Sequence, residues 1–178
     1  GNRPVSAAFL SGNNIFLATV SKDFNTFFKN ILEDNSIVKR THDSKKIFAY
    51  ADIYGINVQN LAFDTILAAY LLNASAKNYD IQRLALEYNC GDVKLSLEPE
   101  SFGDLPRNTA FLSILSDSLN EKIKQNNQEK LLTDIELPLA IVLAQMENLG
   151  FKIDTSGLQN YGDMLKKEAL QLENEIHD

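Results

Sequence analysis

The first forty residues pass from β-prone runs to a helical repeat and back. Residues 5–10 and 15–20 are two β-prone runs separated by Ser-Gly-Asn-Asn, where glycine and asparagine tolerate positive φ, so this stretch predicts a β-hairpin. Over residues 22–35, phenylalanine, isoleucine and leucine recur at helical spacing, which predicts an amphipathic helix. The run Ser-Ile-Val-Lys-Arg-Thr then fits a short strand that leads to His42 and Asp43.

Two further helices are predicted to begin at aspartates. From Asp43, apolar residues recur with helical spacing, so we expect Asp43 to cap the start of a helix and Gly55 to end it. The run Ile-Asn-Val-Gln-Asn-Leu-Ala-Phe predicts a second short strand, after which Asp64 opens an almost wholly apolar helix that we expect to be buried. The order ββαβαβα predicts an α/β fold.

One long loop divides the predicted helices that follow. Residues 80–89 fit a short amphipathic helix. Residues 90–108 are rich in turn formers and charge, which indicates a loop with weak order. We expect the next helix over residues 109–131.

A proline complicates the start of the next helix, which Gly150 is expected to end. Thr133 and Glu136 have the spacing of a capping box. In a helix that began there, however, Pro138 would remove an interior hydrogen bond. We therefore expect a kink, or a helix that begins nearer Leu137.

The final helix is predicted to carry an unpartnered apolar stripe. After the short extended run Phe-Lys-Ile-Asp, apolar residues recur every three or four positions, with Ala169 completing the stripe. The larger members are Leu158, Tyr161, Leu165, Leu172 and Ile176. Because isolated helices gain little stability without burial of an apolar face, this helix needs a packing partner.

The composition is that of a soluble globular chain. Of 178 residues, 44% are apolar and 23% are charged, and no run approaches 18 consecutive apolar residues, so no membrane span is expected. The single cysteine, Cys90, cannot form an intrachain disulfide, which agrees with a reducing cytoplasm. His42 and His177 are too few and too far apart to suggest a zinc site, and we expect both at the surface.

The charge balance argues against a surface built mainly to bind phosphates. The formal net charge is −7, whereas nucleic-acid binding draws on clustered lysine and arginine. Local basic patches remain candidates for contact with nucleic acid, with a solvated face as the equal alternative. The candidate residues are Lys39, Arg40, Lys45 and Lys46.

Two stretches carry a family resemblance. "HDSKKIFAYADIYGINVQNLAFDTILAAYLLN" and "DIELPLAIVLAQMENLGFKIDTSGLQNYGDMLKKEALQLENEI" resemble the bacterial DNA polymerases I of polymerase family A, in the 3′→5′ exonuclease domain and the opening of the polymerase domain. The resemblance implies a ribonuclease-H-like α/β fold with a mixed sheet flanked by helices, followed by a C-terminal helical extension. It implies an exonuclease-like part over residues 1–131 and polymerase helices over residues 132–178. Since the match begins at the family's second strand, we expect an excised fragment whose N-terminus lies further upstream.

The resemblance also implies which metal ligands are retained. Active members hold two divalent metals with an Asp-x-Glu pair, a helix-opening aspartate and a Tyr-x-x-x-Asp motif, because two hard cations need several carboxylates. Asp43 occupies the helix-opening position, but the Asp-x-Glu strand has no counterpart. In the closing motif, Asp117 has Ser113 where the family has tyrosine. Asp64 lies outside the ligand set, so we expect both Asp43 and Asp64 to be helix caps rather than catalytic residues.

One Asp-x-Glu sequence does occur, at Asp134-Ile135-Glu136. It lies in the polymerase-like stretch, and we attribute it to favourable electrostatics at a helix start. No catalytic residue and no metal site are therefore predicted, with Asp43 as a vestigial ligand position.

These expectations combine into one functional hypothesis. The chain would be a catalytically silent exonuclease-like domain that supports the DNA-synthesising core of a bacterial DNA polymerase I in replication and repair. Its partners would be the remainder of the polymerase chain and, in that context, DNA. No cofactor is expected for the fragment itself, Mg²⁺ is expected for the parent polymerase, and the isolated fragment is expected to be a monomer.

Two alternatives remain open. The first is a working two-metal exonuclease whose missing ligands lie upstream or come from the acidic loop. The acidic residues of that loop are Asp92, Glu98, Glu100 and Asp104. The second is a protein-docking module, which is favoured if the three leucines of the final helix form an exposed apolar patch. Those leucines are Leu158, Leu165 and Leu172.

Overall fold

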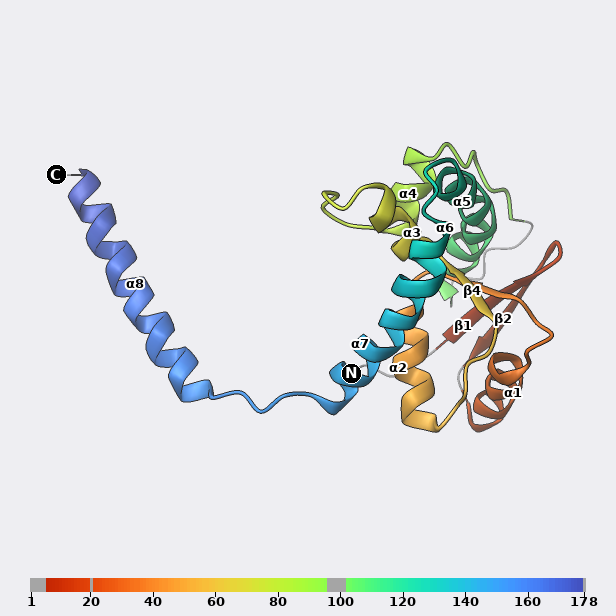
Figure 1. The fold of residues 1–178 in the computed structure, drawn as a ribbon, viewed down its shortest axis with the longest axis horizontal. Coiled ribbons are helices and arrows are strands. Elements are labelled where there is room, and N and C mark those ends of the chain that lie inside the picture. Colours follow the sequence, from red (N-terminus) through yellow and green to blue (C-terminus); the bar gives the residue numbers. More distant parts are fainter. Residues whose placement is uncertain (1–5, 20, 96–101, 178) are drawn as a thin grey trace. The chain divides into compact units, whose positions relative to one another are not determined.

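The computed structural model describes residues 6–19, 21–95 and 102–177, and the chain divides into two compact units (Figure 1). The first unit ends at Asn148, and the second comprises Leu149–Asp178. Each unit is described by itself. None of the helices in the described ranges is long and apolar enough to cross a membrane.

The predicted hairpin is present. Strands β1 (Ser6–Ser11) and β2 (Asn14–Thr19) pair in antiparallel register, with Ser11 opposite Asn14. Gly12 has a φ of 57°, at the position that a type II′ turn assigns to glycine. The predicted runs also included positions 5 and 20, which lie outside the described residues.

Helix α1 (Lys22–Glu33) packs against the hairpin through aromatic side chains. Its N-terminus is capped by Ser21, whose Oγ accepts a 3.2 Å hydrogen bond from the Phe24 N–H. The ring centroids of Phe9 on β1 and Phe28 on α1 lie 5.7 Å apart. This spacing is within the favourable range for aromatic pairs, so the phenylalanine stripe attaches the helix to the sheet.

Two parallel strands and the helices that follow them form the next layer. Strand β3 (Lys39–Thr41) leads through α2 (Ser44–Tyr54) to β4 (Leu61–Asp64), which pairs with β3 in parallel. Helix α3 (Thr65–Leu72) follows directly. The described strands form two separate two-stranded sheets, β1 with β2 antiparallel and β3 with β4 parallel, in place of the single mixed sheet that was expected. Helix α3 is largely buried, as expected, and Tyr70 is its one exposed residue, at 43%.

The main core lies between α3, α4 (Ile81–Glu87) and α5 (Leu105–Gln125). Its buried members are Phe63, Ala68, Ala69, Ile81, Leu84, Ala85, Cys90, Leu115, Leu119, Ile123 and Leu132. Leu115, Leu119 and Ile123 of α5 are fully enclosed, and burial of each such side chain contributes about 1.5–3 kcal/mol. This core supports the strand ends described below.

The helix predicted over residues 109–131 differs from the structure at both ends. Helix α5 begins four residues earlier, at Leu105, because Pro106 occupies the first turn, where a missing N–H costs nothing. It ends at Gln125, and Asn127 adopts a φ of 55° before α6 (Glu129–Leu131) begins. The sequence-based prediction was therefore wrong in treating this region as one helix.

Pro138 lies where helical geometry changes. The helical run that starts with α6 continues through a π-helical turn at Leu132–Glu136 into α7 (Leu137–Leu149). A proline in a helix cannot make the bond to the carbonyl four residues earlier and clashes with it, and a π turn accommodates both effects. The regular α-helical segment α7 begins at Leu137, as expected, but it continues a helical run that is already under way. No helix starts at Thr133, which lies inside the run and whose hydroxyl donates to the Glu129 carbonyl instead of capping a helix.

The second unit contains α8 (Thr155–His177). Asp154 precedes it, and its Oδ1 accepts a 2.9 Å hydrogen bond from the Gly157 N–H. The apolar stripe predicted for this helix is exposed within the unit, with Leu158 60% and Leu172 56% exposed.

Candidate functional site

The carboxylate of Asp64 joins the starts of two helices. Asp64 ends β4, is 1% exposed, and accepts backbone hydrogen bonds from the first turn of both α2 and α3. The donors are the N–H groups of Asp43, Ser44, Ile66 and Leu67, at 3.2, 2.5, 2.7 and 3.4 Å. Since strands β3 and β4 are parallel, their helices start side by side, and one anion satisfies both positive helix ends. The predicted capping role of Asp64 is confirmed and extends to a second helix.

Asp43, which the family resemblance places at a ligand position, also has hydrogen-bond and ion-pair partners. It caps α2 with a φ of 76°, and its Oδ1 accepts a 3.3 Å hydrogen bond from the Lys46 N–H. Its Oδ2 lies 2.9 Å from the Lys46 ammonium. Aspartate is among the few non-glycine residues that tolerate the left-handed conformation. The predicted cap is therefore confirmed, and both carboxylate oxygens have partners.

Asp117 on α5 forms an ion pair with a residue of β3. Arg40 Nη1 lies 2.5 Å from Asp117 Oδ1, and the two side chains are 46% and 66% exposed. Arg40 thus brings a fixed positive charge to the residue that the family resemblance aligns with the closing motif. Ser113, which the resemblance aligns with the family's tyrosine, lies one turn earlier on the same helix.

His42 is not the free surface residue that the sequence predicted. Its Nδ1 lies 2.7 Å from Oγ1 of the buried Thr65. Burial lowers the pKa of His42 below its usual value of 6.5, and this effect outweighs the opposing attraction of Asp64, Asp43 and Asp80. Its environment beside the two helix starts therefore favours the neutral ring.

The four basic candidates for nucleic-acid contact all have protein partners. The Lys39 ammonium donates to three backbone carbonyls, those of Asp34, Ile37 and Gln59, and loss of hydration lowers its pKa. The other three form ion pairs. Arg40 pairs with Asp117, Lys45 with Glu147 at 2.7 Å, and Lys46 with Asp43. The structure distributes these side chains among separate partners, and their predicted role in binding DNA stays a prediction.

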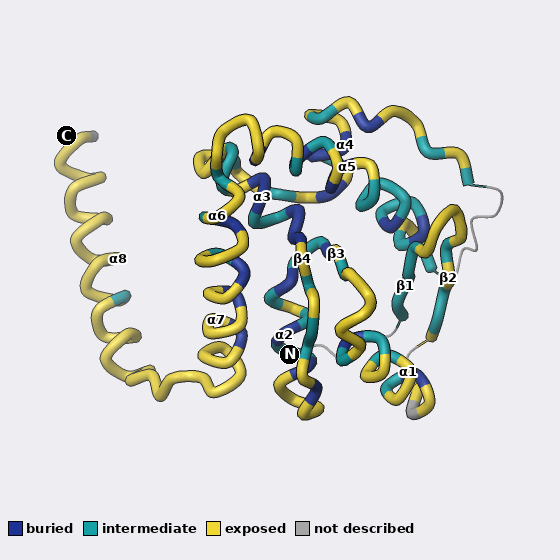
Figure 2. Tube along the Cα trace, turned by 45° about the vertical axis from the view of Figure 1, so that its right-hand side comes forward, coloured by how far each residue is buried: buried dark blue, intermediate teal, exposed yellow. Residues whose placement is uncertain are grey.

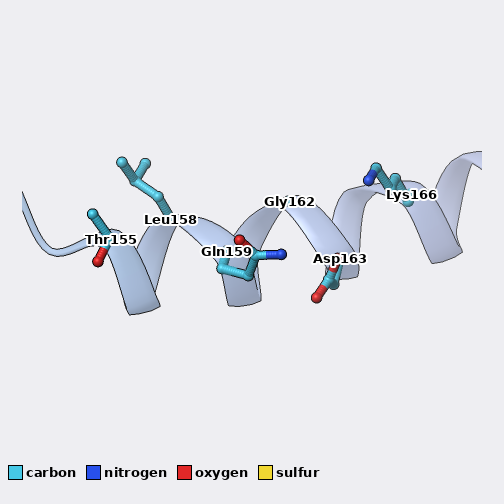
Figure 3. A pocket seen from close by; sticks show the side chains of 6 residues that line it. All are labelled: Thr155, Leu158, Gln159, Gly162, Asp163 and Lys166. Carbon is cyan, nitrogen blue, oxygen red and sulfur yellow. The ribbon is translucent and has the colours of Figure 1, made fainter.

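A cleft of about 220 Å³ lies beside the two helix starts. Asp43 and Asp64 contribute acidic groups on one side, and Glu136 does so from the π-helical turn. The remaining lining residues are Ser44, Lys45, Ile66, Leu67, Leu139, Ala140 and Leu143. A second hollow, shown in Figure 3, is lined entirely by side chains of α8 and has no opposing wall within its unit.

The carboxylates do not gather into a metal-binding cluster where the structure describes them. In residues 6–19, 21–95 and 102–177, no three His, Cys, Asp or Glu side chains are arranged to hold a metal ion. In the acidic loop, Asp92 and Asp104 are exposed. The other two acids proposed as substitute ligands, Glu98 and Glu100, lie outside the described residues.

Sequence reasoning missed two buried hydroxyl residues at this site. Ser44 and Thr65 are both 0% exposed, and each directly follows a capping aspartate. A sequence pattern could have identified these two residues, because an aspartate followed by a small hydroxyl residue, Asp-Ser or Asp-Thr, occurs at both predicted helix starts. A small side chain after the cap allows the neighbouring helix start to approach closely.

The chain is similar in sequence to DNA polymerase I of several bacteria. The chain is 28% identical over 166 residues to DNA polymerase I of Bacillus subtilis and 30% identical over 160 residues to that of Geobacillus stearothermophilus. It is 34% identical over 167 residues to DNA polymerase I of Streptococcus pneumoniae serotype 4. These matches cover 85%, 83% and 84% of this chain, but only 19%, 18% and 17% of the relatives. The chain therefore spans less than a fifth of the length of these proteins.

A solved structure shares the fold. The POL domain of Pol1 from M. smegmatis, determined in complex with DNA primer-template and dNTP, superposes with a TM-score of 0.72 at 19% sequence identity. The match covers 92% of this chain and 29% of that chain. At this identity the likeness shows a common fold only.

The family assignment comes from the region that contains β1 to α4. A profile of the ribonuclease H-like domain of DNA polymerase I matches residues 2–98, which is more than half of the chain and includes both capping aspartates. The ribonuclease-H-like fold implied by the resemblance is thus confirmed. This chain belongs to the family of DNA polymerase I ribonuclease H-like domains, the exonuclease-like domains of bacterial DNA polymerase I.

Proposed function

We propose that this domain is catalytically silent and supports the DNA-synthesising part of a DNA polymerase I. The observation that carries the proposal is the engagement of Asp43. One of its carboxylate oxygens caps α2, and the other pairs with the Lys46 ammonium. A metal ligand at this position would have to give up both partners.

The neighbouring acids support the same conclusion. Hydrolysis by two metals requires several carboxylates that converge on the cations. Asp64 is buried against four backbone N–H groups, and Asp117 pairs with Arg40. Each of these acids thus has a partner within the protein, and their contacts do not direct the carboxylates toward a common metal ion.

The proposal includes the working context of the domain. Residues 1–131 would form the exonuclease-like part, and residues 132–178 the first helices of the polymerase part. The parent protein would act in replication and repair in the bacterial cytoplasm, with Mg²⁺ bound by carboxylates of the polymerase part beyond this region. With a net charge of −7, the domain would bind DNA weakly or not at all by itself.

The test is digestion of a single-stranded oligonucleotide labelled at its 5′ end, with Mg²⁺ or Mn²⁺. The 178-residue chain, its Asp43→Asn variant and the complete gene product are compared with an active proofreading polymerase as positive control. The expected result is no shortening by any of the three samples. Stepwise, metal-dependent shortening that Asp43→Asn abolishes would overturn the proposal and favour the two-metal exonuclease.

A docking module is the second candidate, and a specific observation favours it. Leu158, Leu165 and Leu172 of α8 are 60%, 45% and 56% exposed within their unit. A contiguous apolar stripe of this kind is typical of a contact surface. If α8 is a docking surface, a partner protein should co-purify in stoichiometric amount with the complete gene product, and replacement of all three leucines by serine should abolish this. If the stripe packs only inside the protein, no partner should co-purify.

A further inference from the structure

The cleft beside the starts of α2 and α3 has a buried polar end and an open apolar end. Its far wall is α7, which Figure 2 shows beside α2 and β4. At the polar end, Ser44 and Asp64 are 0% and 1% exposed, whereas Leu139 and Leu143 of α7 are each 42% exposed. A cavity of about 150 Å³ is large enough to bind benzene, so this cleft of about 220 Å³ has room for a small organic ligand.

The hydroxyl of Ser44 is a hydrogen-bonding group without a partner at the buried end. The Ser44 N–H is bound to Asp64, but Ser44 Oγ has no hydrogen bond within the part of the chain that the structure describes. A buried polar group of this kind costs free energy, which a ligand recovers when it supplies the missing hydrogen bond. Because native interiors leave few such groups, this hydroxyl points to an occupant of the cleft.

The charges of the cleft leave one carboxylate unpaired. Asp43 pairs with the Lys46 ammonium, and Asp64 is bound by backbone N–H groups of two helix starts. Lys45, the one basic residue among the described lining residues, is itself paired with an acid of α7. Glu136 of the π turn has no ion pair or side-chain hydrogen bond to any residue that the structure describes. The cleft is therefore complementary to a ligand that carries one positive charge.

We propose that this cleft binds a primary aliphatic amine. An ammonium group has three N–H donors and no acceptor, which suits two partners that both offer oxygen lone pairs. The ammonium pairs with Glu136 and donates to the Ser44 hydroxyl, directly or through one water molecule. The alkyl chain covers Leu139 and Leu143, because removal of apolar surface from water favours binding. This binding function goes beyond the supporting role proposed above and does not depend on it.

The first test measures binding of n-hexylamine to the complete gene product by isothermal titration calorimetry at pH 7.5, where the amine is protonated. n-Hexanol and hexanoate have the same chain without the positive charge, and each should bind at least about tenfold more weakly. Equal binding of n-hexylamine and n-hexanol would overturn the proposal, because the alkyl chain alone would then account for the affinity.

Two variants locate the ligand. Glu136→Gln removes the unpaired charge and Ser44→Ala removes the unpartnered hydroxyl, and each should weaken n-hexylamine binding at least about threefold while leaving n-hexanol binding unchanged. Glu129→Gln, at an exposed acid of α6 outside the cleft, is the matched control and should leave the affinity as it is. Urea midpoints equal to that of the native protein show that the variants are folded. Native affinity for n-hexylamine in either cleft variant would overturn the proposal.

The same ammonium chemistry is available from a free amine and from a lysine side chain of another protein. The Nα-acetyl N-methylamide of lysine represents the second source, and it is titrated beside n-hexylamine. Tighter binding of n-hexylamine identifies a small amine as the ligand, and tighter binding of the lysine derivative identifies a lysine side chain. Failure of both to bind would overturn the proposal. None of these results depends on nuclease activity, so failure of the silent-domain proposal would be recognised separately in the digestion assay.

Discussion

The backbone N–H of Ser44 donates a 2.5 Å hydrogen bond to Oδ2 of Asp64, although the two residues are 20 positions apart. The other carboxylate oxygen accepts from the first turn of α3 and from Asp43. One buried anion thereby fixes the angle between two helices and the strands that precede them. In this domain the buried Asp64 carboxylate, next to the helix start at Asp43, therefore has a structural role.

Replacement of Asp64 by asparagine should strongly destabilise the chain. The amide has one acceptor oxygen and one donor group, so at least one helix start would face an N–H group instead of an oxygen. Buried charge-assisted hydrogen bonds contribute about 1.5–3 kcal/mol each, and we expect the free energy of unfolding to fall by about 3 kcal/mol. Urea denaturation measures this change. Asp92→Asn, at an exposed acid, is the control, and an equal effect of both variants would contradict the shared-cap interpretation.

The sequence predicted the two caps but not their connection. Helix starts are local, since an aspartate after a β-prone run and before helical periodicity can be recognised within a few residues. The contact from Asp64 to Ser44 depends on the parallel pairing of β3 and β4, which no local pattern encodes. The same limit applies to Pro106, where the turn formers before it indicated a loop although proline fits the first turn of α5.

The sequence also did not reveal which acids pair with the basic residues. Lys39, Arg40, Lys45 and Lys46 form a basic cluster in the sequence, which was a candidate for contact with nucleic acid, with a solvated face as the equal alternative. Arg40 and Lys45 instead pair with acids that lie 77 and 102 positions away. Basic residues that are close in the sequence therefore need not form a positive surface patch, because acids from distant parts of the chain can pair with them.

Protonation of His42 should reduce stability at mildly acidic pH. Because burial lowers the pKa of His42 in the folded chain below 6.5, the unfolded chain takes up the proton first as the pH falls. The neutral ring imposes no penalty above pH 6.5, and stability is lost progressively below it. The urea midpoint of the native chain should therefore decrease from pH 7.5 to pH 5.5 more than that of His42→Gln. Parallel pH profiles for the two proteins would contradict a buried neutral ring.

The ion pair between Arg40 and Asp117 should contribute little to stability. Both side chains are about half exposed, and such pairs contribute about 0–1 kcal/mol because water screens the charges. A double-mutant cycle with Arg40→Gln and Asp117→Asn should give a coupling energy below about 1 kcal/mol. Removal of Arg40 should also leave the chain without nuclease activity. Metal-dependent digestion gained by Arg40→Gln would instead identify the guanidinium as the block on a latent site.

Lys39 should be important for stability, unlike its neighbour Lys46. The Lys39 ammonium donates to the carbonyls of Asp34, Ile37 and Gln59, and so ties the end of α1 to the segment before β4. Lys39→Met removes the donor from all three carbonyls, and we expect a loss of about 2 kcal/mol in the free energy of unfolding. Lys46→Met, whose side chain is 82% exposed in its pair with Asp43, should cost less than about 1 kcal/mol. Equal losses in urea denaturation would show that Lys39 acts as an ordinary surface cation, and its availability for phosphate contact would then be restored.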